Sequence, residues 1–529
     1  MTALLRCTAI PGLALALAVL ILPAVQGAET KVRALLAELR DAKEPTKIED
    51  FEARRTTYRK IFALAQKDFS LLVKELDNPD AGIRGQGATS IAKIARFGIV
   101  DFPEGETLQA VLRGTRDRDA GVRGAAVRAV TEIVLRTADG KTSHAGITSG
   151  LLPATSDKSA DVRLGAVAGL RDLAAAKGGQ VPARAEVVAA LCQAIRDEDS
   201  GVQVTGRQGL ERLGRWAVPS LAALLKTDRI AAQDSACLVL ERIGPTARAA
   251  VPALVKILAE APESWIRSHA AQAIGAIGAS DRATVTALVH ALSGDDPDLR
   301  HVRYEAAGAL IRVNRALGKE KGLPILVKGL KTEDPLEREA VCWTLIEAAP
   351  ELAEKLAVPV LIDLFKVARQ DPRRWFWDNP AQLLGRLGPR AKAAVPAIAE
   401  YLDSVPTWYP HDTIRALERI GPSARAAIPA LVRKLSHKNY GARLAAGRAL
   451  VAIDPAAATQ HTVPLFIDVL KCYDAELRKG AAEVLGKIGP PAAAAVPKLK
   501  EALKDEYPMV REAATRALKS VLRAGPKTD

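Results

Sequence analysis

The stretch that decides the fold is IGPTARAAVPALVKIL at residues 243–258. Close copies of it are LGPRAKAAVPAIAEYL at 387–402, IGPSARAAIPALVRKL at 420–435 and IGPPAAAAVPKLKEAL at 488–503. Self-similarity with a period of about 20 to 50 residues is typical of a solenoid, in which each unit buries its apolar face only against its neighbours. The sequence therefore predicts a stacked array of repeats. Such an array fixes an architecture but leaves the activity open.

Two residue positions mark the period of the array. The first is a proline that usually follows valine, and it occurs at Pro219, Pro252, Pro324, Pro359, Pro396, Pro429, Pro464 and Pro497. Its steps are 33 to 37 residues long, except for one double step of 72 in which Thr286 takes the place of the proline. The second is an arginine about fifteen residues later, at Arg84, Arg123, Arg163, Arg267, Arg303, Arg338, Arg443, Arg478 and Arg511. Gln203 stands once in place of the arginine. Since several of these positions precede Pro219, the repeats begin well before that residue.

Each repeat has the pattern of two helices. Apolar residues recur at i, i+3, i+4 and i+7 in 251–258 and again in 122–135, as one buried face of a helix requires. Aspartate-rich turns such as DRDAG at 117–121 supply helix N-caps. Gly244 suits a left-handed helix C-cap, and the proline of the VP step should begin the next main helix or kink it. The prediction is a chain of helical hairpins.

This pattern resembles HEAT repeats. The shared features are two helices in about 35 residues, a proline in the first, an aspartate in the turn and an arginine early in the second. The sequence pattern D..VR..A...L..IG is most similar to the bacterial variety called phycobilisome-lyase-like HEAT repeats. The resemblance covers residues 70–524. It implies an all-α, right-handed α-solenoid, or alpha-alpha superhelix, of about thirteen repeats. The arginine is missing or displaced near Asp234, Trp375 and His411, where the regular ladder is in doubt.

The N-terminal segment has the features of a signal peptide. Arg6 is followed by an apolar stretch from Ala9 to Val25, and Val25-Gln26-Gly27 places small residues where a signal peptidase cleaves. We expect residues 1–27 to be removed and the protein to be exported, periplasmic or secreted; retention as an N-terminal membrane anchor is the alternative. No later stretch has the length and apolarity of a membrane span, so no integral membrane body is expected. We expect residues 28–69 to be a helical cap and 525–529 a short tail.

The composition agrees with a solenoid. Hydrophobic residues make up 48% of the chain but aromatic residues only 4%, which predicts a core of Ala, Leu, Val and Ile. Cys192, Cys237, Cys342 and Cys472 are scattered one to a repeat, so we expect buried single thiols rather than disulfides. The formal net charge of +14 keeps open a role in binding an anionic polymer at the cell envelope.

Residues that could carry a reaction are few. The sequence has no glycine-rich phosphate loop, no HExxH, no paired CxxC and no serine nucleophile elbow, and its seven histidines are never three or four residues apart. We therefore expect no cofactor, no metal site and no enzymatic activity. A lyase-type solenoid enzyme is the alternative, which rests on the resemblance and on Trp377-Asp378. Turn aspartates precede the repeated arginines by four residues, and we expect them to form a ladder of charge-assisted hydrogen bonds between repeats: Asp80, Asp119, Asp199, Asp334 and Asp474.

The one cluster that departs from the repeat is aromatic. RRWFWDNP at 373–380 and TWYPHD at 407–412 place aromatic residues in the turns of successive repeats, and Tyr440, Tyr473 and Tyr507 continue them at similar steps. Aromatic side chains beside arginines are favoured at recognition surfaces. We therefore predict that a protein or peptide partner binds along the concave face and the aromatic turn edge, with a site of Arg373, Arg374, Trp375, Trp377, Trp408, Tyr409 and Tyr440. Packing of turn against turn is the alternative role of these rings.

Overall fold

The chain forms an all-α solenoid, which confirms the predicted fold class. The computed structural model describes residues 27–42, 48–97, 104–136, 144, 146–176, 181–227, 229–294, 296–370, 380–404, 411–472 and 474–523. In these ranges every regular element is a helix. The helices cluster into two compact units, Met1–Arg212 (unit 1) and Leu213–Asp529 (unit 2), which are described separately.

Unit 1 begins with a helix over residues 27–41 and α2 (Ile48–Lys67), both in the segment predicted to cap the array. Its repeats follow as α3 (Ser70–Lys74), η2 (Glu75–Asp77), α4 (Ala81–Phe97), α5 (Glu104–Gly114), α6 (Ala120–Arg136), η3 (Ile147–Leu151), α8 (Leu152–Ala154), α9 (Ala160–Ala176), α10 (Arg184–Ala194) and α11 (Ser200–Leu213). The second helix of each repeat packs on that of the next, α4 on α6 and α6 on α9. The capping role of the first helices stays a prediction.

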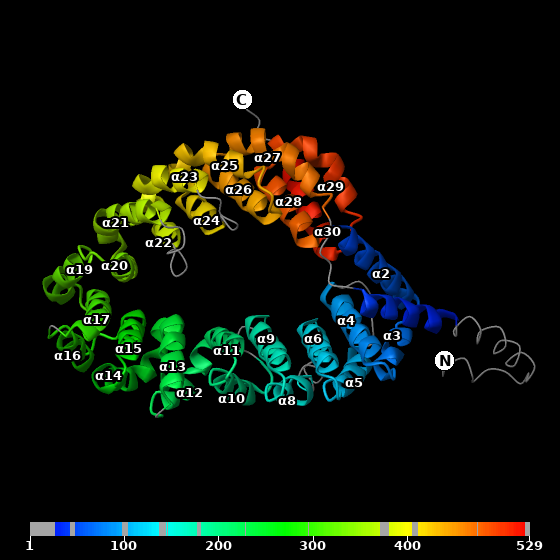
Figure 1. Cartoon of the computed structure of the whole chain (residues 1–529), viewed down its shortest axis with the longest axis horizontal. Helices are drawn as coiled ribbons and strands as arrows, with labels where there is room; N and C mark the ends of the chain where they lie inside the picture. The colour runs from blue at the N-terminus through cyan, green and yellow to red at the C-terminus, as the bar shows by residue number, and fades with distance from the viewer. Residues whose placement is uncertain are drawn as a thin grey trace, which may run out of the picture. The chain divides into compact units, whose positions relative to one another are not determined.

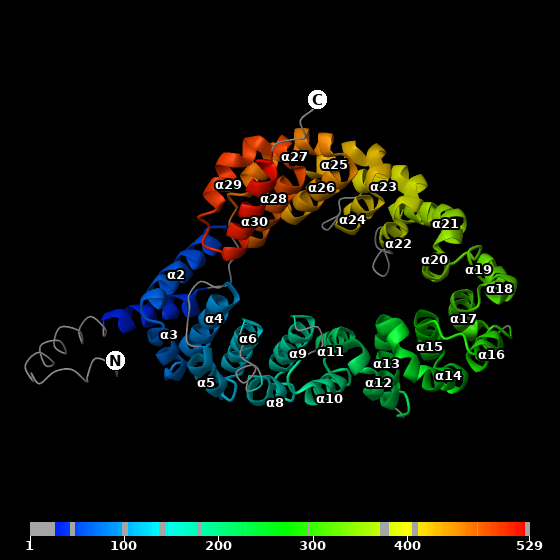
Figure 2. The ribbon, with the colours of Figure 1, turned by 180° about the vertical axis from the view of Figure 1, so that it is seen from behind.

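Unit 2 continues the same alternation of first and second helices. Its first repeats contain η4 (Gly214–Trp216), α12 (Val218–Leu224), α13 (Ile230–Ile243), η5 (Gly244–Ala250), α14 (Val251–Glu260), α15 (Ser264–Ile277), α16 (Arg282–Ala291), η6 (Pro297–Leu299), α17 (Arg300–Val313), α18 (Arg315–Leu317), η7 (Gly318–Gly322), α19 (Leu323–Gly329) and α20 (Pro335–Ala348). Its later repeats contain α21 (Pro350–Gln370), α22 (Pro380–Leu387), η9 (Gly388–Ala394), α23 (Val395–Ser404), α24 (His411–Ile420), η10 (Gly421–Ala427), α25 (Ile428–Lys434), α26 (Tyr440–Ile453), α27 (Pro455–Val469), α28 (Ala475–Ile488), η11 (Pro490–Ala495), α29 (Val496–Ala502) and α30 (Pro508–Val521). Figures 1 and 2 show α23, α25, α27 and α29 in one layer of unit 2, and α24, α26, α28 and α30 in the other.

The repeated phrase folds as a short 3-10 turn followed by a main helix. In 243–258, Gly244 begins η5 and Pro252 is the second residue of α14. Pro359 instead lies inside the long helix α21, so both predicted positions of the proline occur. Gly244 has φ +67° and ψ −138°. The positive φ suits glycine, but the ψ value shows that the prediction of a left-handed helical C-cap was wrong.

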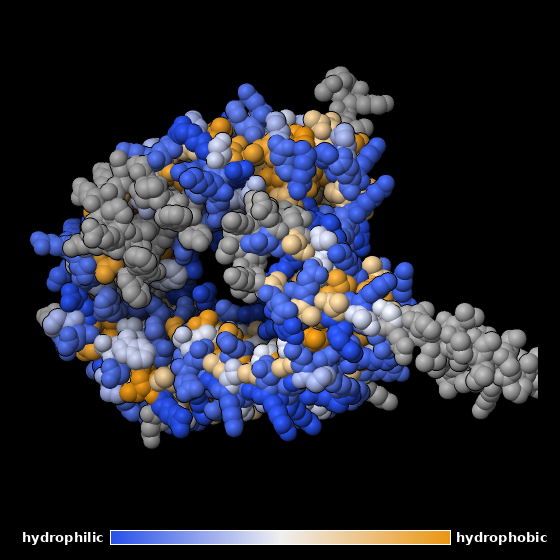
Figure 3. Space-filling model, turned by 45° about the vertical axis from the view of Figure 1, so that its right-hand side comes forward, coloured by the Kyte–Doolittle hydropathy of each residue, from blue (hydrophilic) through white to orange (hydrophobic). Residues whose placement is uncertain are grey.

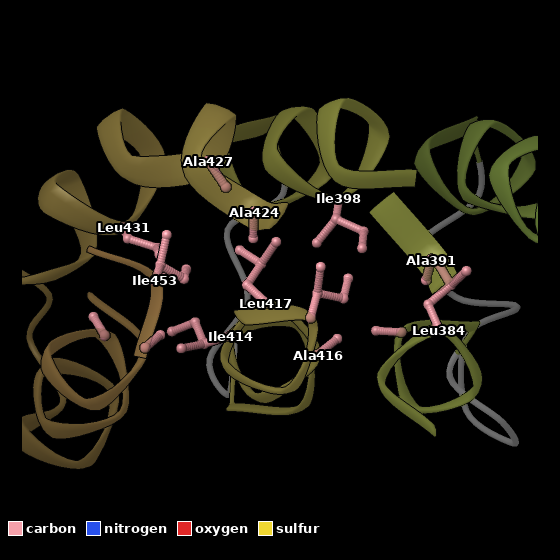
Figure 4. Close-up of a cluster of buried hydrophobic side chains, with 14 of the residues drawn as sticks. Leu384, Ala391, Ile398, Ile414, Ala416, Leu417, Ala424, Ala427, Leu431 and Ile453 are labelled. Atoms are coloured by element: carbon pink, nitrogen blue, oxygen red, sulfur yellow. The ribbon is translucent and has the colours of Figure 1, made fainter. Parts of the chain in front are cut away.

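The core lies between the two helix layers and consists mainly of aliphatic side chains, as predicted. Figure 4 shows Leu384, Ile398, Leu417 and Leu431 from successive helices directed into one shared layer. All four are buried. Cys192, Cys237 and Cys342 are buried single thiols, as predicted, whereas Cys472 is a single thiol that is only half-buried. None of the helices in the described part of the chain has the length and apolarity that crossing a membrane requires.

Candidate functional site

The repeated arginines of unit 1 form a ladder that links each repeat to the next. Arg123 donates from Nε and Nη2 to the two carboxylate oxygens of Asp157, at 2.7 and 2.8 Å. Its Nη1 donates to the backbone carbonyls of its own turn, at Asp117 and Arg118. The same bidentate bond joins Arg84 to Asp117 and Arg163 to Asp197. We call the series of repeated arginines the arginine ladder.

The ladder between adjacent repeats was predicted, but its aspartates were assigned wrongly. The acceptor is the aspartate six residues before the next arginine, not the one four residues before it. Asp119 and Asp199 accept hydrogen bonds from the backbone N–H groups of Val122 and Val202 and so cap their own helices. Asp80, Asp334 and Asp474 likewise accept from backbone N–H groups at the starts of α4, α20 and α28. The turns at 117–119 and 197–199 thus use one aspartate for the ladder and a second for the N-cap.

The ladder pairs of unit 1 are well shielded from water. The side chains of Arg163 and Asp197 are only 9% and 12% exposed. The hydrogen bonds from Arg84 lower the pKa of Asp117, and those from Arg123 lower the pKa of Asp157. Charge-assisted bidentate pairs of this kind are among the stronger polar contacts in proteins. In unit 1 the ladder is therefore a structural device.

Most of the ladder in unit 2 lacks the carboxylate partner. The acceptor position holds Ala261, Pro297, Thr332, His437 and Cys472, and only the last step has an aspartate, where Asp505 binds Arg478. The arginines Arg267, Arg303 and Arg443 hydrogen-bond backbone carbonyls, and none of them forms an ion pair with a described residue. Arg338 pairs with Asp363, whose side chain is 51% exposed. Guanidinium groups of unit 2 therefore remain available for other contacts.

Exposed apolar or aromatic side chains stand next to these arginines. Trp265, His301 and Leu336 each precede a ladder arginine by two residues, at the first turn of α15, α17 and α20. Trp265 is 43% exposed and Leu336 is 57% exposed. His301 is exposed as well. We define the unit 2 turn edge as Trp265, Arg267, His301, Arg303, Leu336, Tyr440 and Arg443.

Of the residues predicted to form the binding site, only Tyr440 belongs to the described part of the chain. Its ring is half-buried, packs against the core and lies 4.7 Å from the Arg443 guanidinium carbon. Tyr507 precedes the first residue of α30, and its ring lies 5.7 Å from the guanidinium carbon of Arg478, the ladder arginine of the preceding repeat. The two tyrosines therefore lie at neighbouring but not equivalent positions, and they contact different arginines. The predicted residues that lie outside the described ones are Arg373, Arg374, Trp375, Trp377, Trp408 and Tyr409.

Trp265, His301 and Leu336 were not predicted as binding residues from the sequence. Each of them lies two residues before a ladder arginine. Large apolar residues at that position are Trp265, Leu336 and Met509, and the last is half-buried. Their exposure could not be read from the pattern, because it depends on how each turn packs on the next.

Carboxyl groups gather on the face of unit 2 formed by α13, α15, α17 and α20, which we call the second-helix face. Glu305 accepts a hydrogen bond of 2.7 Å from Thr344 Oγ1 and another from Gln272. Burial raises the pKa of Glu305 to about 7, and the nearby Glu241 adds to the shift. Burial also raises the pKa of Glu241. The two carboxyl groups line one shallow hollow.

Glycine forms part of the wall of this hollow. A Cβ added to Gly308 would lie 2.4 Å from Cγ2 of Thr344, so a larger residue could not keep this helix spacing. The rim is internally paired: Arg312 donates to the backbone carbonyl and a carboxylate oxygen of Glu347, at 3.0 and 3.1 Å. Arg386 bonds the other carboxylate oxygen and lies over Trp343, 4.1 Å from the ring centroid. The second-helix face thus offers a fixed array of charges and one aromatic wall.

The chemistry of these groups favours binding. Burial raises the pKa of the Cys192 thiol to about 11 and that of Cys342 to about 12, so both thiols stay protonated near neutral pH. No group of three or more His, Cys, Asp or Glu in the described part of the chain is placed to hold a metal ion. In the view of Figure 3, hydrophobic residues lie in small groups among hydrophilic ones. The exposed apolar side chains are thus suited to act as separate anchors.

Comparison with known proteins gives a family resemblance and no curated relative. The family model for HEAT repeats matches residues 218–310 and 463–527, both in unit 2. No curated protein matches the chain. The phycobilisome-lyase-like variety of HEAT repeat is not confirmed by this match and stays a prediction.

Several solved structures resemble the chain at low sequence identity. The chain is 12% identical to a chain in the Kap95:Nup1 complex, with a TM-score of 0.47 over 94% of this chain and 73% of that one. It is also 12% identical to yeast importin-beta (Kap95p), with a TM-score of 0.43 over 94% and 68%. A third is Kap121p bound to Nup53p, at 14% identity and a TM-score of 0.43 over 92% and 61%.

Proposed function

We propose that this chain is a non-enzymatic scaffold that binds a protein or peptide partner along the second-helix face and the turn edge of unit 2. The observation that carries the proposal is the unit 2 turn edge, where exposed Trp265 stands beside Arg267, which bonds only a backbone carbonyl among the described residues, and exposed Leu336 stands beside Arg338, whose partner Asp363 is half-exposed. The similarity to HEAT repeats supports it, because stacked repeats create extended binding surfaces.

The turn edge combines two kinds of contact that protein interfaces use. Burial of a tryptophan or leucine side chain contributes about 1.5 to 3 kcal/mol, and tryptophan and arginine are enriched among the residues that dominate binding energy. Arg267 and Arg303 keep nitrogen donors that bond no described residue. A partner that covers Trp265 and Leu336 can therefore place acceptors on the neighbouring guanidinium groups.

The predicted aromatic residues extend the proposed surface. We propose that Trp375, Trp377, Trp408 and Tyr409 act as further anchors with Arg373 and Arg374, because they fall in the turns of the repeats between Leu336 and Tyr440. Tyr440 would contribute its exposed edge and the adjacent Arg443.

Export is part of the proposal and rests on the first 27 residues. A cleaved signal peptide would place the scaffold in the periplasm or outside the cell, where its partner must then be found. N-terminal sequencing of the protein from its native host should begin at Ala28. A chain that starts at Met1 in the membrane fraction would instead support a retained anchor.

The site assignment can be tested by substitution at the turn edge. The double variant Trp265→Ala/Leu336→Ser should lose at least tenfold in affinity for the purified natural partner, because two anchors of about 1.5 kcal/mol or more are removed. The matched control is Trp216→Ala, which removes a tryptophan of similar exposure, 40%, away from the turn edge. Both variants should keep the helical melting transition of the wild type. Equal affinity of the double variant and the control would refute the assignment.

A polyanion-binding protein is the second candidate, since the same arginines favour it. Retention on a polyanion matrix that falls steeply with salt would support this candidate. Retention of the partner that is insensitive to salt would favour the scaffold.

A further inference from the structure

A groove of about 660 Å³ lies between α14 and α16 in unit 2. We infer that it binds an acidic segment of the partner protein in which an apolar side chain is flanked by carboxylates. This inference rests on the proposed function, because it names the chemistry of the partner segment. The lining residues that carry it are Leu258, Arg267, Arg282, Ala283, Ala287 and His290.

The groove exists because the facing helices carry small side chains. Ala283, Ala287 and Ala291 follow one another at intervals of four along α16, so they share one face of that helix. Leu258 and Ala259 of α14 form the opposite wall. Methyl and methylene groups thus make up the floor. A volume of this size matches pockets that enclose a few side chains or one small organic molecule.

The charge of the groove has one sign. Its titratable lining residues are Arg267, Arg282 and His290, and no carboxylate is among them. Arg282 and His290 are exposed, and neither side chain forms a hydrogen bond or ion pair with a described residue. Arg267 donates from Nε to the carbonyl of Leu258, which leaves its other nitrogens unused by the described residues.

The acidic residues next to the groove on α14 and at the start of α16, Glu260 and Asp281, have other partners. Asp281 caps α16 and accepts from the backbone N–H and the hydroxyl of Thr284, at 3.0 and 2.6 Å. Glu260 lies 3.8 Å from the ammonium of Lys256. The positive charge at the groove is therefore not neutralised from within these two helices, and it complements carboxylates on an incoming chain.

The apolar floor distinguishes a peptide from a simple polyanion. A polymer of sulfate or phosphate groups would satisfy the guanidinium groups but leave the alanine surface of the groove in water. A segment with a leucine-sized side chain next to glutamate or aspartate buries that surface. Its carboxylates can bond Arg267 and Arg282 at the same time. Burial of apolar surface and charge-assisted hydrogen bonds then both stabilise the complex, so the groove favours an amphipathic acidic segment.

The test uses the full-length protein and a fluorescein-labelled peptide of alternating leucine and glutamate, followed by fluorescence anisotropy. The wild-type protein should bind it at least tenfold more tightly than matched peptides with glutamine for glutamate or serine for leucine. Arg282→Gln removes a positive charge from the groove, and Ala287→Leu fills its floor. Each variant should weaken binding about tenfold. The matched control is Arg248→Gln, since Arg248 is also exposed, unpaired and in unit 2. It should bind like the wild type.

Three results would overturn the inference. They are equal binding of the leucine–glutamate and serine–glutamate peptides, unchanged binding by Ala287→Leu, and displacement of the peptide by decanoate of equal or higher affinity. The last result would assign the groove to a small amphipathic carboxylate. If Ala287→Leu keeps full affinity for the natural partner while Trp265→Ala/Leu336→Ser loses it, the groove fails and the scaffold stands. If neither variant loses affinity, the proposed surface fails with it.

Discussion

The repeated arginine has a different role in each of the two units. In unit 1, Arg84, Arg123 and Arg163 each bind an aspartate of the following repeat. In unit 2 that acceptor position is occupied by alanine, proline, threonine, histidine or cysteine before the final step. The arginine persists without an aspartate at that position, and Arg267 stands beside exposed Trp265. The arginine links adjacent repeats in unit 1, whereas in most of unit 2 it is a surface group.

The hydrogen bonds that survive in unit 2 explain why the arginine is still present. Arg303 donates from Nη1 to the carbonyls of Gly294 and Asp296, as Arg123 does to its own turn. This half of the interaction holds the turn and the start of the second helix together. Only the half that reaches the next repeat is missing. Gln203 shows the minimal form in unit 1, since its amide donates to the carbonyl of Asp197 at 2.7 Å but cannot form an ion pair.

The largest expected effect comes from breaking a closed step of the ladder. Arg163→Ala should lower the free energy of unfolding of unit 1 by about 3 kcal/mol, because it leaves the shielded Asp197 carboxylate without its cation. Arg267→Ala in unit 2 should cost only about 1 kcal/mol, because it removes a single hydrogen bond to Leu258. Urea unfolding followed by circular dichroism measures both values. Similar losses in the two variants would mean that the ladder has the same role in both units.

The second prediction concerns buried titratable groups. They should change the stability of the two units in opposite directions as pH rises. Burial raises the pKa of Glu305 in unit 2 to about 7 and lowers that of Lys93 in unit 1 to about 8. Folded unit 2 therefore holds a proton that the unfolded chain releases between pH 4.5 and 7, so its stability falls by roughly 2 kcal/mol as pH rises through that range. Lys93 should instead add stability to unit 1 between pH 8 and 10.5, where its unfolding takes up a proton, while the raised pKa of Cys192 opposes this gain above pH 9.

Matched substitutions separate these two effects. Glu305→Gln keeps an acceptor for Thr344 and should reduce the fall in unit 2, leaving the part that Glu241 contributes through its own raised pKa. Lys93→Met should abolish the rise in unit 1. Unfolding midpoints across the two pH ranges provide the measurement. The assignment to Glu305 is wrong if the glutamine variant keeps the slope of the wild type.

The repeated positions made the fold predictable. The proline and arginine recur in register, so each repeat could be recognised from a few residues, and local helix patterns supplied the rest. The aspartates of the ladder could not be assigned in the same way. Asp117 and Asp119 are two residues apart in one turn, and only the path of the turn directs the first toward Arg84 and the second toward the N–H of Val122.

The candidate site was predictable only where it follows the repeat. Tyr440 was found because it follows the aromatic residues at 408–409 by about one repeat, at the start of α26. The hollow on the second-helix face was not, since Glu241, Glu305 and Thr344 stand at different offsets from the ladder position and meet only after four helices pack together. No single repeat contains the signal for it. The aromatic residues at 373–377 and 408–409 stay a prediction.

The smallest expected effect on stability gives the sharpest test of the comparison between the units. Thr332 precedes Arg338 by six residues, as Asp157 precedes Arg163, so Thr332→Asp should restore the missing acceptor for Arg303. Nε and Nη2 of Arg303 bond no described residue, although Arg123 uses the same atoms to bind Asp157. Closing this step should stabilise unit 2 by about 1 kcal/mol, because the new pair is partly exposed. The neutral control is Thr332→Asn, which should gain little.

The same variant tests whether the open ladder serves binding. If Arg303 contributes to the partner surface, closing its step should weaken capture of the purified partner while the helical melting transition rises slightly. Titration calorimetry of Thr332→Asp beside Thr332→Asn separates the effect of charge from that of shape. A variant that gains stability and keeps full affinity would show that the missing carboxylates of unit 2 are a packing difference with no part in recognition. A gain in stability coupled to a loss in affinity would mean that unit 2 has given up cohesion between repeats for a surface that a partner completes.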